Sequence, residues 1–330
     1  MKQLLVTLVL WMVFTIFSCT KEANLPIAQT LAHLPQLPSH FPPIVYPEGN
    51  EPTAARWQLG KALFFEKALS KDSSVSCADC HSPESAFAHH LPTSPGAFGR
   101  TGTSNSPSLW NVAYHPYFLR GATVPTLEMQ VLVPIQEDNE FAHNIVALAE
   151  ELSNNQEYQR MSQLAYGREI DPYVITRAIA QFERTLIAAN SAYDRFVNGD
   201  VSALSIDAQR GMQLFQSERL QCAQCHSGFN FTNYALERNG TDTTTTQEGR
   251  YRATLLPADY GRFKVPSLRD VAKSAPYFHD GRYATLQEVI QHYSRGGDPM
   301  APAHERIRPL NLTTQEQLDL LAFLNALSEP

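Results

Sequence analysis

The pattern Cys-x-x-Cys-His occurs twice in the sequence, at 77–81 and at 222–226. Two thiols at this spacing can add to the two vinyl groups of a haem, while the adjoining imidazole binds the iron. In 330 residues with five cysteines and eleven histidines, a chance match is expected roughly 0.0025 times. A zinc site or a thioredoxin-like thiol pair would need a sequence context that is not visible here. Two covalently bound haem c groups are therefore predicted, held by Cys77, Cys80, His81, Cys222, Cys225 and His226.

Length and composition describe an ordinary folded protein of two domains. Each half of the chain carries one haem motif, which suits one haem domain per half. Apolar residues make up 43% of the chain and charged residues 18%, as in ordinary globular proteins. The formal net charge of −7 argues against a nucleic-acid partner, because nucleic acids are bound by basic surfaces.

The N-terminal residues have the pattern of an export signal. Lys2 precedes an apolar segment at 4–17, which is too short for an ordinary membrane span. We therefore expect 1–18 to be a signal peptide. Residues 16–19 resemble a bacterial lipobox and predict a lipid anchor at Cys19, unless this cysteine is an ordinary residue of a cleaved signal. Either alternative predicts a location in the periplasm or the outer cell envelope, with membrane contact only through the anchor.

Helical patterns dominate the rest of the chain. Seven prolines between 26 and 52 forbid long helices, so 19–52 is predicted to be a Pro-rich tether. Apolar spacing predicts helices at 53–67, 143–152, 173–188, 205–215 and 313–327. The stretch 82–125, rich in Gly, Pro, Ser and Thr, predicts a long ordered loop of the kind that is usually functional. Since strand signals are few, the predicted fold is mainly α, with two cytochrome c-like haem domains at 53–200 and 201–330 and long ordered loops.

Several segments around the two motifs are similar to a known family. They read LGKALFF at 59–65, GTSNSPSL at 102–109, LEMQ at 127–130, EF at 140–141, VPSLRDV at 265–271 and APYFHDG at 275–281. Over about residues 53–330 the chain resembles the bacterial di-haem cytochrome c peroxidases and their MauG-type relatives. The resemblance implies that 53–200 is a peroxidatic domain, with His81 on the haem that meets hydrogen peroxide. It implies that 201–330 is an electron-transfer domain, with His226 on the haem that receives electrons.

The resemblance also indicates residues above the first haem. In the family a Gln and a Glu ten residues apart lie there, and Gln130 and Glu140 match that spacing. Glu140 would act as general acid and base, and Gln130 would position peroxide or water. Ala97 stands where other members carry a distal histidine that blocks the iron, so the first haem is expected to be open in the oxidised protein. His89 and His90 are nearby alternatives.

One family feature is missing between the haems. Members usually carry a Trp in a Phe-Trp-Asp-Gly-Arg stretch, whereas this chain reads YFLRGA at 117–122. Leu119 or Arg120 falls at its place, so electrons would pass directly or through a nearby tyrosine. Trp110 is close in sequence, but its simpler interpretation is an aromatic residue of the core.

A calcium site is also implied by the resemblance. Asn105 matches an asparagine ligand of the family, and the backbone carbonyls of Ser274 and Pro276 match the protein's other ligands. Calcium binds such amide and carbonyl oxygens, with waters completing its shell. An Asn before Ser-Pro can instead organise a turn.

Three residues are candidates for the sixth ligand of the second haem. Alignment with the family on 285–290 puts Tyr293 where peroxidases have Met and MauG-type proteins have Tyr. A phenolate stabilises ferric iron and lowers its potential. His292 is adjacent, and Met300 follows two glycines in a loop, so both are alternatives. Tyr293 can also be a buried aromatic with a satisfied hydroxyl.

These residues predict an exported cytochrome-c peroxidase that reduces hydrogen peroxide to water with electrons from a small cytochrome c or cupredoxin. The alternatives are a MauG-type di-haem oxidase that modifies a protein partner and a non-catalytic electron carrier. Tyr293 favours the MauG-type oxidase, whereas the missing Trp does not. Gln130 and Glu140 argue against a simple carrier. A homodimer is expected by analogy with the family.

Overall fold

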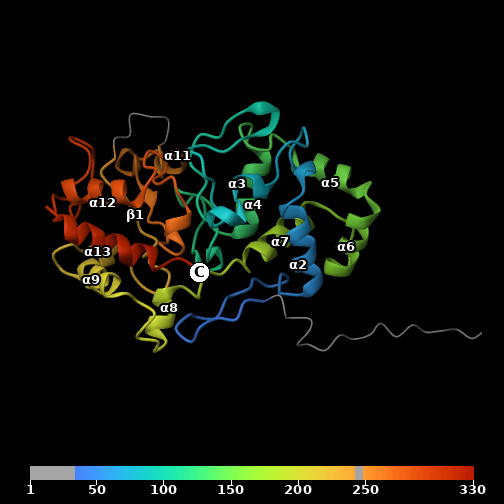
Figure 1. The fold of residues 1–330 in the computed structure, drawn as a ribbon. Coiled ribbons are helices and arrows are strands. Elements are labelled where there is room, and N and C mark those ends of the chain that lie inside the picture. The colour runs from blue at the N-terminus through green and yellow to red at the C-terminus, as the bar shows by residue number, and fades with distance from the viewer. Residues whose placement is uncertain (1–33, 242–247) are drawn as a thin grey trace, which may run out of the picture.

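The computed structural model describes residues 34–241 and 248–330, which form two helical lobes side by side (Figure 1). The predictions for 1–18 and Cys19 lie outside these residues. The helices are α2 (Ala54–Phe64), α3 (Cys77–Cys80), α4 (Leu127–Gln136), α5 (Ile145–Ser153), α6 (Gln156–Tyr166), α7 (Pro172–Glu183), α8 (Ala192–Val197), α9 (Ile206–Gln216), α10 (Cys222–Cys225), α11 (Tyr251–Thr254), α12 (Leu286–Arg295) and α13 (Thr314–Asn325). Strands β1 (Leu236–Glu237) and β2 (Phe263–Lys264) form one short antiparallel pair. The predicted mainly α fold is confirmed. None of the helices in the described ranges is long and apolar enough to cross a membrane.

The five predicted helices are present, with different ends. They correspond to α2, α5, α7, α9 and α13. The prediction for 53–67 runs past the end of α2 at Phe64, and the prediction for 173–188 runs past the end of α7 at Glu183. The stretch 82–125 contains only short 3-10 helices, at Pro83–Ser85, Ala97–Gly99 and Val112–Tyr114. The predicted long ordered loop is therefore present.

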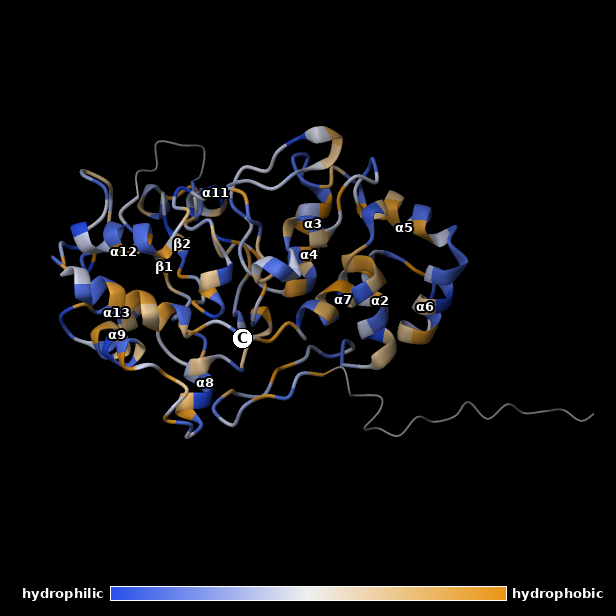
Figure 2. Ribbon diagram, viewed as in Figure 1, coloured by the Kyte–Doolittle hydropathy of each residue, from blue (hydrophilic) through white to orange (hydrophobic). Residues whose placement is uncertain are grey.

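The first lobe is built where α2 crosses α7. Its hydrophobic cluster spans residues 59–186 and includes Leu63 and Phe64 of α2, which are fully buried. A Cβ at position 60 would lie 1.9 Å from the carbonyl oxygen of Ala178 in α7, so only Gly60 permits this close crossing. Figure 2 shows the apolar colour concentrated on α7 and α13, while α12 is mainly hydrophilic.

The second lobe repeats the plan of the first. Its cluster spans residues 215–327, and α9 crosses α13 at Gly211, where a Cβ would lie 1.9 Å from the carbonyl oxygen of Asp319. In each lobe the crossing helix leads into a haem motif, at α3 and at α10. The equivalent helices therefore carry the two motifs to equivalent positions.

A Pro-Ser-Leu loop also recurs in both lobes, at 107–109 and 266–268. Two residues further on, Asn111 and Asp270 adopt left-handed backbone conformations, with φ of 59° and 56°. The Asn111 N–H donates to the Leu186 carbonyl at 2.8 Å, and the Asp270 N–H donates to the Leu327 carbonyl at 3.0 Å. Each loop is thus tied to the chain just beyond the last long helix of its lobe.

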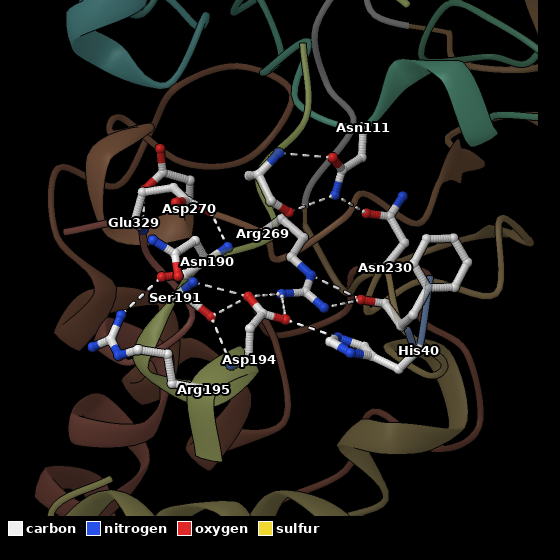
Figure 3. A network of polar contacts seen from close by, with 12 residues as sticks. His40, Asn111, Asn190, Ser191, Asp194, Arg195, Asn230, Arg269, Asp270 and Glu329 are labelled. Atoms are coloured by element: carbon white, nitrogen blue, oxygen red, sulfur yellow. Dashed lines mark hydrogen bonds and ion pairs between the residues drawn. The ribbon is translucent and has the colours of Figure 1, made fainter. Parts of the chain in front are cut away.

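A buried ion pair joins the second loop to α8 and to the N-terminal segment (Figure 3). Arg269 Nη1 lies 2.6 Å from both carboxylate oxygens of Asp194, and both side chains are buried. His40 Nε2 lies 3.0 Å from the same carboxylate, and the buried Phe41 packs on Phe229 with ring centroids 4.8 Å apart. The described part of the Pro-rich segment, 34–52, has no helix, but these contacts hold it against the lobes.

Candidate functional site

One cavity of about 900 Å³ is lined by both Cys-x-x-Cys-His motifs. Loops 102–110 and 263–268 and the inner faces of α4, α12 and α13 supply most of its other walls. The wall near the second motif is apolar and includes Leu286, Ile290 and Leu324. The two predicted haem sites therefore open into a shared space between the lobes.

The first motif positions its histidine through a local hydrogen bond. Ser76 caps α3, and its backbone N–H donates to Asp79 Oδ2 at 2.8 Å, which fixes the short helix that carries Cys77 and Cys80. His81 Nδ1 donates to the Phe87 carbonyl at 3.0 Å, which leaves Nε2 as the available ligand atom. Burial lowers the pKa of His81 to about 4, so the imidazole is neutral at physiological pH, as metal binding requires.

The second motif has the same geometry. His226 Nδ1 donates to the Phe231 carbonyl at 3.1 Å, and burial lowers the pKa of His226. Burial raises the pKa of the thiols of Cys80 and Cys222 to about 12. Thiols of this kind are not the activated thiolates of a redox pair. None of the four motif cysteines is in a disulfide, so both motifs fit covalent haem attachment.

The predicted distal pair lies in the same cavity. Gln130 is on α4 and Glu140 is in the turn that follows it, and both line the cavity together with His81. The Ala97 N–H donates to the Glu140 carbonyl at 2.7 Å, which holds the 96–97 loop directly behind this turn. Ala97 is fully buried and is not among the residues that line the cavity. The structure therefore brings Gln130, Glu140 and the first motif together.

The environment of Glu140 favours its protonated form. Burial, and to a smaller extent the nearby carboxylate of Glu137, raise the pKa of Glu140 to about 7, although Arg252 opposes the shift. A group with this pKa can both accept and return a proton near neutral pH. Neither His89, which is buried, nor His90, which is exposed, lines the cavity, so Glu140 is the better placed proton carrier.

The structure distinguishes among the three candidate ligands of the second haem. Tyr293 on α12 lines the cavity. His292 is fully buried behind it, with Nε2 bonded to the Asn239 carbonyl at 2.9 Å and Nδ1 to the Tyr283 hydroxyl at 3.1 Å. Met300 is fully exposed and does not line the cavity. Of the three, only Tyr293 is positioned to reach a haem beside the second motif.

Comparison with known proteins decides the family. The methylamine utilization protein MauG of Methylorubrum extorquens is 34% identical to this chain over 292 residues, which cover 87% of this chain and 82% of that protein. The chain belongs to the family of di-haem cytochrome c peroxidases and MauG proteins. The family profile described as di-haem cytochrome c peroxidase matches residues 54–202.

Other similar proteins are named either as cytochrome c peroxidases or as MauG-like proteins. The cytochrome-c peroxidase IdrP1 of Pseudomonas sp. is 33% identical over 335 aligned residues, which cover 90% of this chain and 86% of that protein. A crystal structure of a MauG-like protein associated with microbial copper homeostasis has a TM-score of 0.83 and 30% identity, and it covers 89% of this chain and 95% of that chain. Membership implies two haem c cofactors and oxidoreductase chemistry.

Between the two haem sites the chain differs from the family pattern that has a Trp. Leu119 and Arg120 both line the cavity there. Trp110 lines it as well, and its indole N–H donates to Asp270 Oδ2 across the two lobes at 2.8 Å. Trp110 also packs edge-on against Phe87, with ring centroids 5.0 Å apart. Trp110 is thus a partly buried aromatic with one polar partner, and it borders the haem cavity.

The predicted calcium ligands also line the cavity, but one of them already accepts a hydrogen bond. Asn105, Ser274 and Pro276 are all among the lining residues. The Oδ1 atom of Asn105, which the calcium prediction requires, accepts a hydrogen bond from Arg120 Nη2 at 3.0 Å. The calcium site stays a prediction, and in this arrangement the Arg120 guanidinium lies at the oxygen that calcium would need.

Lys264 is a cavity-lining cation that the sequence patterns do not predict. Lys264 of β2 lines the cavity beside Arg120, and its Nζ bonds to the Tyr117 carbonyl at 3.0 Å and to His115 Nδ1 at 3.1 Å. These contacts join segments about 150 residues apart, so no local pattern reveals them. The repeat of the Pro-Ser-Leu loop was the available signal, because Lys264 lies two residues before its second copy.

Proposed function

We propose that the protein is an exported di-haem peroxidase that reduces hydrogen peroxide to water with electrons from a small cytochrome c or cupredoxin. The observation that carries the proposal is the position of Glu140 and Gln130 in the cavity of the first haem motif, with the pKa of Glu140 near 7. A simple electron carrier does not need an acid–base group at this place.

Three residues of the first site would have separate roles in the reaction with peroxide. His81, oriented by its bond to the Phe87 carbonyl, would hold the iron of the first haem, which supplies the redox centre for peroxide cleavage. Gln130 would orient peroxide with its amide. Glu140, as carboxylate, would take the proton of the oxygen that approaches the iron and return it to the oxygen that leaves as water. A pKa near the working pH makes both directions of this transfer accessible.

The second site would supply electrons. His226 would hold the second haem, and Tyr293 is proposed as the second axial ligand of its iron. Burial raises the pKa of Tyr293, so the phenol is neutral in the polypeptide alone and would ionise only on binding a cation such as ferric iron. Phenolate ligation lowers the potential of a haem.

Tyr293 is also the observation that favours a second function. A MauG-type oxidase that modifies a protein partner would use the same two haem sites, and the relatives named above include MauG. Turnover of hydrogen peroxide with a reduced small cytochrome c tests the choice. Rapid oxidation of the cytochrome supports the peroxidase. A reaction that consumes no more peroxide than the two haems themselves can reduce, with no oxidation of the cytochrome, contradicts it and favours the oxidase.

The ferric spectrum separates both enzymes from a carrier. A high-spin haem beside a low-spin haem is expected, because Ala97 offers no ligand to the first iron. Two low-spin haems would contradict peroxide chemistry at the first site.

We further propose a location in the periplasm or outer envelope with a lipid anchor at Cys19, which mass analysis of the membrane-extracted protein can test. Homodimer formation, proposed by family analogy, is testable by analytical ultracentrifugation.

A further inference from the structure

The side chain of Arg120 is fixed on Asn105 by three hydrogen bonds. Arg120 Nε and Nη2 donate to the backbone carbonyl of Asn105 at 3.0 and 2.6 Å, and Nη2 also donates to the side-chain Oδ1 at 3.0 Å. The Asn105 N–H in turn donates to the His279 carbonyl of the second lobe at 2.9 Å. The guanidinium therefore lies where the two lobes meet, on the wall of the haem cavity.

A second cation lies beside it. The Lys264 N–H donates to the Arg120 carbonyl at 2.7 Å, and Lys264 Nζ is held by the Tyr117 carbonyl and the His115 ring. Burial, and to a smaller extent the charge of Arg120, lower the pKa of Lys264 to about 8. The segments 117–120 and 263–264 thus place two positive charges next to each other.

Within the described residues, no carboxylate forms an ion pair with either of these two cations. Among residues 34–241 and 248–330, neither Arg120 nor Lys264 takes part in an ion pair. Asp280 is near enough to raise the pKa of Arg120, but its carboxylate is bonded to Arg282 Nε at 2.7 Å. Burial lowers the pKa of Arg120 to about 10. A cation in such a place is costly without an anion.

The anion of fitting chemistry is a carboxylate that enters the cavity with a haem. Each haem carries two propionates, and the guanidinium fork matches a carboxylate. We propose that Arg120, supported by Lys264, is the fixed cation that binds haem propionate between the two haem sites, and that it makes the site at Asn105 independent of calcium. The proposal rests on the two bound haems and not on the peroxidase activity.

Metal analysis of the wild-type protein with both haems bound is the first test. After exchange into chelator-treated buffer, we expect far less than one calcium per chain, and unchanged midpoint potentials of both haems when calcium is added or EGTA is present. One tightly held calcium per chain, or a potential that depends on added calcium, would overturn the proposal. This result does not depend on peroxide turnover, so it stands apart from the failure of the proposed function.

Charge substitution at position 120 is the second test. Arg120→Gln removes a positive charge that favours the reduced haem, so a negative shift of at least one midpoint potential is expected. Arg120→Lys should show a smaller shift. Arg160→Ala on α6, whose exposed side chain pairs with Glu157, removes the same net charge far from the cavity and is the matched control. Equal potentials in Arg120→Gln and Arg160→Ala, with two haems retained in each, would overturn the proposal.

If Arg120→Gln does not retain both haems, the midpoint potentials can be measured in Lys264→Gln, which removes the neighbouring positive charge. A negative shift of a midpoint potential is expected again, because this substitution also removes a positive charge from the cavity wall. A wild-type potential in Lys264→Gln would contradict a cationic pair at this site.

Discussion

Replacing Glu140 with Gln keeps the size of the side chain and its capacity for hydrogen bonds, but removes its proton chemistry. General acid–base groups contribute about 10²–10⁴-fold to a rate, which corresponds to about 3–5.5 kcal/mol at about 1.4 kcal/mol for each tenfold. We therefore expect Glu140→Gln to retain both haems and to lose most of its peroxide turnover. Steady-state oxidation of a reduced small cytochrome c measures the loss, with Glu157→Gln on exposed α6 as the control.

The pH dependence makes the same prediction sharper. Since the pKa of Glu140 is about 7, the carboxylate that accepts the first proton should become populated, and the rate should rise, between about pH 6 and 8. Glu137→Gln removes a repelling charge and should move the midpoint to lower pH, whereas Arg252→Ala removes an attracting charge and should move it to higher pH. A midpoint that stays fixed in both variants, or an unchanged rate in Glu140→Gln, would refute the assignment.

Folding stability should reflect the same carboxyl group. A pKa of about 7 in place of 4.5 means that the folded protein holds this proton more tightly than the unfolded chain. Stability is therefore lost as pH rises from 4.5 through 7, by at most about 3.4 kcal/mol. Glu140→Gln lacks this loss, so thermal unfolding should show the variant gaining stability over the wild type between pH 5 and 8. A constant difference over that range would contradict the raised pKa.

Three other predictions follow from the haem sites and the buried ion pair of Arg269. Denatured mass should show two haems per chain, and His226→Ala should stop donor-driven turnover; a mass with one haem would contradict the di-haem assignment. Tyr293→Phe should change the ferric spectrum and raise the potential of the second haem, whereas Met300→Ala, at an exposed position, should change neither; identical spectra for both would exclude Tyr293 as ligand. Arg269→Met leaves the buried Asp194 without its guanidinium partner and should cost about 3–5 kcal/mol in chemical denaturation. A loss below about 1 kcal/mol would show that the pair is not structurally important.

The sequence predicts what depends on neighbours along the chain. The haem motifs and the five helices follow from local spacing, and capping residues such as Thr313 and Asp171 mark where two of the helices begin. α6 and α12 carried usable local signals as well. Asn155 caps α6, and Thr285 with Glu288 forms a capping box at the start of α12. These helices are polar enough that apolar periodicity alone does not indicate them.

Sequence patterns do not predict α4, for a different reason. It contains Pro134, a residue that normally interrupts a helix because it lacks the N–H donor. The Pro134 carbonyl accepts from the Phe141 N–H at 3.1 Å, so the turn that carries Glu140 folds back on this point of the helix. The contact of Arg120 with Asn105 and that of Trp110 with Asp270 lie beyond any local pattern, because loops and separate lobes bring these residues together.

The cavity shared by the two motifs has a consequence for the order in which the protein is made. If a space of about 900 Å³ stayed without its haems, its apolar walls would be exposed to water, and this costs free energy for each Å² of apolar surface left unburied. Water in the polar parts reduces this cost, but the apolar wall around Leu286 and Ile290 gains little from it. The chain is therefore not expected to reach its folded state first and accept its haems later. Attachment at both cysteine pairs is therefore expected to come before the lobes close, which would make biogenesis and folding one process for this protein.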